Sequence, residues 1–87
     1  MSDVSAVFGA NLRRLREERG WSQQQFCIRT GYSARATLSL IEGGRRGVYL
    51  HTAVMFAEAL GVRVDELLTG AYARGGTQQQ NSGAFDA

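Results

Sequence analysis

The amino-acid sequence predicts an all-α fold, a compact bundle of about five short helices. Apolar residues recur at three- and four-residue steps in several separate segments, and no segment alternates with a period of two over a useful length. Glycines and residues that favour helix starts separate these segments at short intervals. The chain of 87 residues has room for one small domain and little space for a deep catalytic cavity.

The first helix is expected over residues 4–19. Its apolar positions repeat at helical spacing and define one buried face, at Val4, Val7, Phe8, Leu12 and Leu15. Ser2 or Asp3 is placed to cap its start, and Gly20 to end it.

A second helix is expected to begin after Ser22. Ser22 and Gln25 stand three residues apart, the spacing of a capping box in which each side chain bonds the backbone amide of the other residue. Gly31 can adopt the positive φ at which a helix ends.

A third helix is expected over residues 34–42, directly after this glycine turn. Ser33 is a candidate N-cap, Leu38 and Ile41 share one face, and a pair of glycines ends the helix. Two short helices around a glycine turn, followed by basic residues, form the pattern of a helix-turn-helix.

Two more helices are expected before the chain changes character. The fourth carries apolar residues at helical spacing and ends before Gly61; these residues are Leu50, Ala53, Val54, Ala57 and Leu60. A short fifth helix over residues 65–68 has its two acids in the first turn, where they complement the helix dipole. We therefore assign residues 1–69 to the helix-turn-helix domain.

Residues 70–87 are rich in Gly, Gln, Asn and Ser and lack apolar periodicity, so a flexible C-terminal tail is expected there. Tyr72 and Phe85 are its bulky apolar residues, and either could dock on the domain or on a second subunit.

Cysteine content and hydropathy argue against several other classes of protein. The single cysteine, Cys27, excludes an internal disulfide and a cysteine-based zinc site, and His51 has no partner at ligand spacing, so no metal site is expected. No apolar run approaches the roughly 18 residues of a membrane span, and the first residues lack the features of a signal peptide. We expect a cytoplasmic protein that is not an enzyme and binds no cofactor.

Positive charge is concentrated in the first half of the chain. The segment from Arg13 to Arg46 holds eight arginines and three acids, for a charge of +5, whereas the rest of the chain carries −3. This asymmetry predicts a polyanionic partner. All ten basic residues are arginine, which suits bidentate contacts to phosphate or guanine, although genome composition would produce the same bias.

Taken in order, these residues resemble the helix-turn-helix family of the phage lambda repressor and Cro type, also called the XRE family. The resemblance covers roughly residues 8–70. It rests on the following pieces: Asn11-Leu12-Arg13, Leu15-Arg16, Trp21-Ser22-Gln23, Phe26-Cys27, Gly31-Tyr32-Ser33, Ile41-Glu42 with Gly44, the stretch from Ala57 to Val62, and the stretch from Asp65 to Leu68.

One departure from the family pattern affects the third helix. The distance from Gly31 to Ile41 is one residue longer than in the family, so either the turn holds an extra residue or Thr37 and Leu40 replace Leu38 and Ile41 as the buried pair. We favour the extra residue, because burying Thr37 would require a partner for its hydroxyl.

The resemblance implies that the start of the third helix enters the major groove of double-stranded DNA, while flanking residues contact phosphates. Arg35 is the main candidate for a bidentate contact to guanine, with a phosphate contact as its alternative. The expected DNA-binding residues are Gln23, Gln24, Ala34, Arg35, Ala36, Thr37, Ser39, Leu40, Arg45 and Arg46.

The resemblance also implies that Arg16 and Glu42 pair inside the domain and are structural. A homodimer is expected, because a helical domain this small should otherwise cover its remaining apolar side chains. The expected dimerisation residues are Met55, Val62, Val64, Leu67, Leu68 and Tyr72.

These observations favour a sequence-specific transcriptional regulator, similar to a phage Cro protein or short repressor, that binds a roughly palindromic operator. An antitoxin or a restriction-modification controller would look the same. The alternative is an adaptor that uses this fold to bind a protein partner. The length leaves no room for a substantial ligand-sensing domain, so no small-molecule effector is expected.

Overall fold

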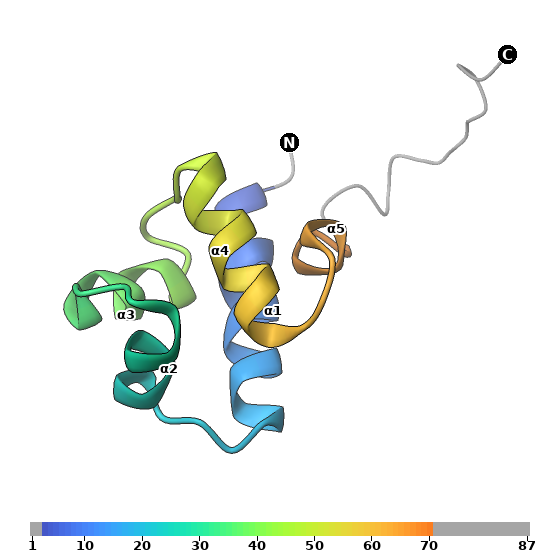
Figure 1. Cartoon of the computed structure of the whole chain (residues 1–87). Coiled ribbons are helices and arrows are strands. Elements are labelled where there is room, and N and C mark those ends of the chain that lie inside the picture. Colours follow the sequence, from blue (N-terminus) through green and yellow to red (C-terminus); the bar gives the residue numbers. More distant parts are fainter. Residues whose placement is uncertain (1–2, 71–87) are drawn as a thin grey trace, which may run out of the picture.

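The computed structural model describes residues 3–70, which form five helices and no strand (Figure 1). The helices are α1 (Val4–Glu18), α2 (Gln23–Thr30), α3 (Arg35–Glu42), α4 (Leu50–Leu60) and α5 (Val64–Leu67). The expected all-α bundle is confirmed. Residues 71–87, including Tyr72 and Phe85, lie outside the described residues.

Most helix ends follow the local signals in the sequence. The Asp3 side chain accepts a hydrogen bond from the Ala6 amide at 3.1 Å and caps α1. Ser22 and Gln25 form the reciprocal capping box of α2, and Gly31 ends that helix at a φ of 78°. These caps depend on residues three or four positions apart, which is why the sequence alone predicts them.

The start of α3 differs from the prediction. Ala34, not Ser33, occupies the N-cap position, and it provides no side-chain hydrogen bond to the first turn. The extra residue in the turn places Ser33 one position too early to cap the helix.

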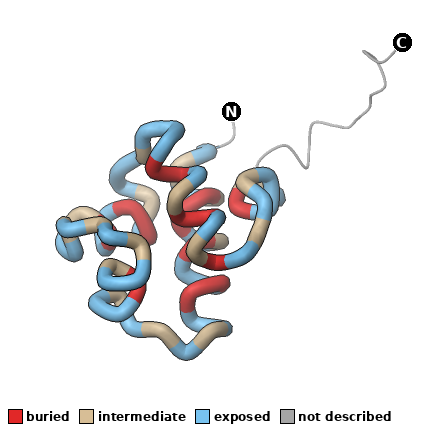
Figure 2. The backbone as a smooth tube through the Cα atoms, in the orientation of Figure 1, coloured by how far each residue is buried: buried red, intermediate tan, exposed pale blue. Residues whose placement is uncertain are grey.

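All five helices contribute residues to one core, and Figure 2 marks the buried positions in red. Three aromatic rings join α2, the turn and α4: Phe26 lies 5.1 Å from Phe56 between ring centroids, and Tyr32 meets Phe56 edge-on at 5.2 Å. Cys27 packs partly buried against this core, and burial raises the pKa of its thiol. The buried apolar residues are Phe8, Leu12, Leu15, Phe26, Leu38, Ile41, Ala53, Phe56, Ala57, Leu60 and Leu67.

The buried face of α4 agrees only in part with the one that periodicity suggested, since Ala53, Ala57 and Leu60 are buried as expected. Leu50 and Val54 are exposed, while Phe56 is fully buried beside Ala53 and Ala57. Because α4 carries apolar residues on most of its circumference, spacing could not decide which of them face the core.

Two glycines let α1 and the end of α3 pack closely together. A Cβ atom on Gly9 would lie 2.0 Å from the backbone oxygen of Ile41, and one on Gly44 would lie 2.9 Å from the Ala6 Cα. These positions therefore exclude any side chain.

Long side chains of α1 fasten the C-terminal helices. Asn11 donates from Nδ2 to the backbone oxygens of Leu67 at 2.9 Å and Thr69 at 3.0 Å, and Arg19 donates to the backbone oxygen of Leu60. These bonds satisfy carbonyls at the ends of α4 and α5 that have no partner within their helix. Among residues 3–70, no helix is long and apolar enough to cross a membrane.

Candidate nucleic-acid interface

The register of α3 determines which of its side chains are available to a ligand. Leu38 and Ile41 are buried at 0% and 1% exposure, whereas Leu40 is 41% exposed and Thr37 is half-buried. The expected extra residue in the turn is therefore confirmed, and the helix keeps Leu38 and Ile41 as its inner pair.

The opposite side of α3 is largely exposed. Arg35, Ala36, Ser39 and Leu40 are exposed, and Thr37 is half-buried beside them. Three of these five side chains are small or polar and short, so a ligand can approach the helix backbone closely. An exposed helix with one long cation near its start has the shape and donors needed to enter a major groove.

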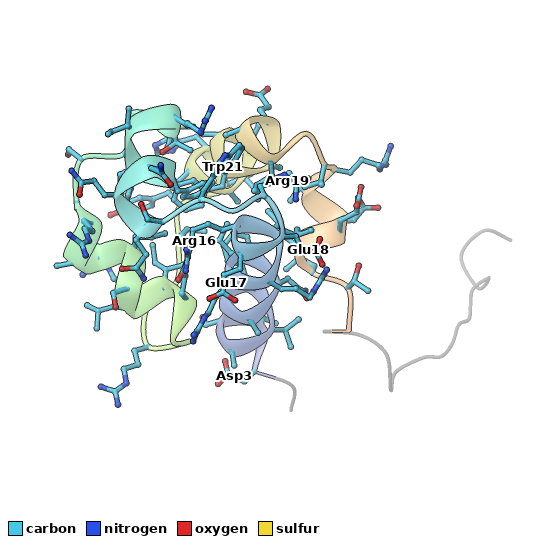
Figure 3. All side chains as sticks on the ribbon, turned by 90° about the horizontal axis from the view of Figure 1, so that it is seen from below. Asp3, Arg16, Glu17, Glu18, Arg19 and Trp21 are labelled. Atoms are coloured by element: carbon cyan, nitrogen blue, oxygen red, sulfur yellow. The ribbon has the colours of Figure 1, made fainter. Side chains whose placement is uncertain are left out.

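A buried ion pair fastens α3 to α1 behind this surface. Arg16 donates from Nε to Glu42 Oε2 at 2.7 Å and from Nη2 to Glu42 Oε1 at 3.0 Å, and its Nη1 donates to the Trp21 backbone oxygen at 2.6 Å. Figure 3 shows Arg16 in the space between α1 and the α2–α3 pair. The hydrogen bond to Glu42 raises the pKa of Arg16, so the guanidinium keeps its charge despite burial.

Gln23 joins the same network from the start of α2. Its Nε2 donates to Glu42 Oε1 at 3.0 Å, which fixes the side chain beside the first turn of α2. The second hydrogen of this amide and the exposed Gln24 remain available to a ligand, next to helix amides that favour anions. One carboxylate thus connects α1, α2 and α3.

The arginines divide into paired and unpaired groups. Arg13 and Arg14 bond Glu17 and Glu18 along α1, at 3.0 and 3.1 Å. By contrast, Arg35 on α3 and the loop residues Arg45 and Arg46 form no ion pair within residues 3–70.

Arg29 has an aromatic partner instead of an acid. Its guanidinium carbon lies 4.4 Å from the centroid of the Trp21 ring, and Trp21 in turn stacks on Phe26 with 6.4 Å between centroids. Arg35, Arg45 and Arg46 therefore flank α3 at its start and beyond its end, while Arg29, in the last turn of α2, lies over the Trp21 ring just before that helix.

The expected dimerisation residues do not form one exposed surface. Leu67 is fully buried in the core, so it is unavailable to a partner and its assignment was wrong. Its side chain is the buried one of α5, which packs against α1 and α4. Met55, Val62, Val64 and Leu68 are half-buried, and Tyr72 lies outside the described residues.

Two residues that hold the helices together were not predicted as structural residues from the sequence. Gly9 sets the distance between α1 and α3, and Asn11 holds α5 against α1. A glycine within an apolar helix pattern is the signal that could have revealed the close contact. For Asn11, the family motif contains the residue, but its partners lie 56 and 58 positions away.

Across residues 3–70, no group of three or more His, Cys, Asp or Glu side chains could hold a metal ion.

Comparison with known proteins decides the family. A model of the helix-turn-helix domain matches residues 7–69. The chain belongs to the helix-turn-helix family of the lambda repressor type. An uncharacterised HTH-type transcriptional regulator, y4dJ of Sinorhizobium fredii, is 40% identical over 67 residues, which are 77% of this chain and 86% of that protein.

Solved helix-turn-helix structures share the fold. The hypothetical transcription factor NHTF from Neisseria aligns with a TM-score of 0.69 and 34% identity, over 75% of this chain and 74% of that one. The restriction-modification controller C.AhdI from Aeromonas hydrophila aligns with a TM-score of 0.67 and 33% identity, over 72% and 94% of the two chains. The protein is thus a transcriptional regulator with a DNA-binding helix-turn-helix fold, and not an enzyme.

Proposed function

We propose that this helix-turn-helix protein binds a specific, roughly palindromic operator as a homodimer and represses transcription by occupying it, as a phage Cro protein does. The observation that carries the proposal is the outer side of α3, where Arg35 stands unpaired among small and polar side chains while the inner side is held by Leu38 and Ile41.

Arg35 is the residue that specifies a base. It lies in the first turn of α3, the part of a recognition helix that goes deepest into the major groove. A bidentate contact from its guanidinium to guanine supplies roughly 1–3 kcal/mol of discrimination. Thr37 and Ser39 offer hydroxyl groups to neighbouring bases, while Ala34, Ala36 and Leu40 offer methyl contacts to thymine.

Phosphate contacts fix the position of the domain on the duplex. Gln23 is oriented for this task by its bond to Glu42, and Gln24 is exposed next to it. Arg45 and Arg46 lie in the loop after α3, exposed and free of acidic partners within the described domain. Contacts on both sides of α3 hold the helix in register with the bases.

A homodimer explains how so small a domain reaches useful specificity. Two copies related by a two-fold axis place their recognition helices in successive major grooves, about 34 Å apart. The operator then has two similar half-sites in opposite orientation.

Selection of bound duplexes from a random pool tests the proposal. We expect enrichment of a palindrome with half-site centres about one helical turn apart, and binding at least about 10³-fold tighter than to random duplexes. Affinity should fall steeply with salt as counterions are released. A pool that shows no enrichment would exclude this function and favour the adaptor.

A further inference from the structure

A groove lies between the turn that joins α2 to α3, the loop that follows α3 and the start of α4. Its volume of about 580 Å³ is within the range of about 300–1,000 Å³ that is typical of small-molecule sites. Among the described residues that line it, Arg46 alone has a proposed contact to DNA, and none is acidic.

The groove contains a buried hydroxyl that has no partner in the described domain. Thr52 lines the groove and is 6% exposed. The hydroxyls of Thr30 and Thr69 donate to backbone oxygens one turn earlier, at 2.9 and 3.2 Å, whereas the Thr52 hydroxyl forms no hydrogen bond within residues 3–70. Because buried polar groups are nearly always hydrogen-bonded, this hydroxyl indicates a partner that enters through the groove.

The electrostatics of the groove favour an anion. Arg46 is exposed and forms no ion pair within residues 3–70. Tyr49, at the N-cap position of α4, provides no side-chain hydrogen bond, so the first amides of this helix are left available to a negative group. A cationic ligand would meet the charge of Arg46 with no carboxylate in the lining to offset it.

Aromatic side chains in the lining favour a flat ligand. The Tyr49 and His51 rings stack with 5.9 Å between centroids and 9° between planes, and Tyr32 lines the groove from the turn. Met55 adds a polarisable thioether, which suits contact with a ring. A phosphate of duplex DNA has no flat face, so it would use the arginine and leave the rings and the Thr52 hydroxyl without a partner.

We propose that this groove binds a small aromatic carboxylate, with the carboxylate bonded by Arg46 and Thr52 and the ring against the aromatic lining. Arg46 is also a proposed phosphate contact, so the ligand and DNA compete for one guanidinium. The helix-turn-helix domain then senses the ligand itself, with no need of a separate sensing domain. The competition rests on the proposed function, whereas binding of the ligand can be measured without DNA.

The first test titrates the full chain with sodium benzoate and follows the backbone amides by NMR. We expect saturable shifts centred on Gly47, His51 and Thr52, with a dissociation constant on the order of 1 mM, as so small a ligand allows. Benzamide has the ring without the charge, and inorganic phosphate has the charge without the ring. Each should bind at least about 10-fold more weakly. Equal binding of either probe, or no saturable shift with benzoate, would overturn the proposal.

Two arginine variants test the charge contact. Arg46→Ala should weaken benzoate binding about 10-fold. Arg45→Ala is the matched control, because Arg45 is the neighbouring exposed arginine of the same loop and lies outside the groove lining, so benzoate binding should stay unchanged. Equal losses in the two variants would show attraction to the loop charge in general and would contradict a site in the groove.

Thr52→Val tests the buried hydroxyl, because valine keeps the shape of the side chain. Benzoate binding should weaken about 5-fold, while the variant melts at or above the wild-type temperature, since the hydroxyl has no partner to lose in the described domain. A lower melting temperature with unchanged benzoate binding would assign the hydroxyl to the fold and overturn its role in the groove.

Binding to the selected operator tests the competition. Saturating benzoate should raise the dissociation constant for the operator several-fold relative to sodium chloride of the same ionic strength. Thr52→Val should bind the operator as the wild type does and respond less to benzoate. An operator affinity that saturating benzoate leaves unchanged would overturn the competition. If no duplex is enriched, the DNA-binding proposal fails, and the NMR titration still decides whether the groove binds an aromatic carboxylate.

Discussion

The two sides of α3 have opposite constraints. The inner side is held by apolar contacts, by a glycine contact with α1 and by the ion pair between Arg16 and Glu42. The outer side is exposed except for the half-buried Thr37, and apart from Leu40 its side chains are small, polar or cationic. The residues that stabilise the domain and the residues proposed to contact DNA thus lie on opposite sides of one helix. Substitutions on the outer side should therefore leave stability intact, and substitutions on the inner side should remove no DNA contact directly.

The largest effect is expected from Glu42→Ala. Removing this carboxylate leaves Arg16 charged, buried and without its partner, which costs about 3–5 kcal/mol of unfolding free energy. Small domains are often little more stable than that, so the variant should be largely unfolded. Circular dichroism and urea titration measure the loss.

Glu18→Ala is the matched control for the buried pair. Glu18 bonds Arg14 at 3.1 Å on the surface of α1, where both side chains are more than half exposed. Its removal should change the free energy of unfolding by at most about 0.5 kcal/mol. Equal stability of the two variants would show that the buried pair does not hold α3.

The next largest effect is expected from Gly9→Ala, which tests the close contact between α1 and α3. The added methyl group would meet the Ile41 backbone oxygen at 2.0 Å, and a backbone atom cannot move aside without shifting the helix. We expect a loss of about 3 kcal/mol in unfolding free energy, at the upper end of overpacking effects.

Gly43→Ala is the control, because Gly43 lies at the end of α3, next to the residues that Gly9 contacts. At this position the nearest atom to an added Cβ lies 3.5 Å away, and φ is −83°, which any residue can adopt. The substitution should leave stability unchanged or raise it by about 0.4–1 kcal/mol. A Gly9→Ala variant as stable as Gly43→Ala would contradict the packing described for α1 and α3.

Helix ends and the contact at Gly9 differ in how far the sequence could predict them. Helix ends at Asp3, Ser22 and Gly31 depend on neighbours within four positions, so they are readable from the sequence. The contact at Gly9 depends on a backbone 32 positions away, because its partner is Ile41. No local pattern contains that information.

In the candidate site, the sequence could predict which residues are buried only where a side chain fits either the core or the surface, but not both. Leu38 and Ile41 had to be inward because Thr37 in the core would lack a partner for its hydroxyl, and the structure confirms this. Leu67 was misassigned for the opposite reason, since a leucine fits both a core and a protein interface. Its location depends on how α5 packs, which four residues of sequence cannot specify.

Arg35→Ala probes the outer side of α3 and should have a smaller, purely functional effect. We expect unchanged thermal stability, because Arg35 is exposed and unpaired within the described domain. Discrimination at one base pair of each half-site should fall by roughly 1–3 kcal/mol, measured by competition between duplexes that differ at single positions.

Arg63→Ala removes the same charge at a different place. Arg63 lies at the start of α5, where its side chain is 81% exposed and bonds Asp65. The Arg63→Ala substitution should leave the preference for particular bases in each half-site unchanged. If Arg35→Ala weakens binding to all duplexes equally, the residue contacts a phosphate and not a base.

The smallest effect is expected at Ala34, where the two sides of α3 meet at its poorly capped start. Ala34 occupies the N-cap position without a side-chain hydrogen bond, so Ala34→Ser offers an oxygen to the amides of the first turn and should raise stability by about 0.5–1 kcal/mol. Ala36→Ser is the control within the helix, where serine should instead lower the free energy of unfolding by about 0.5 kcal/mol. Equal shifts in melting temperature would contradict the assignment of Ala34 as the cap. If Ala34→Ser is more stable but binds the selected operator less tightly, the missing cap reflects the close approach of DNA to this end of the helix.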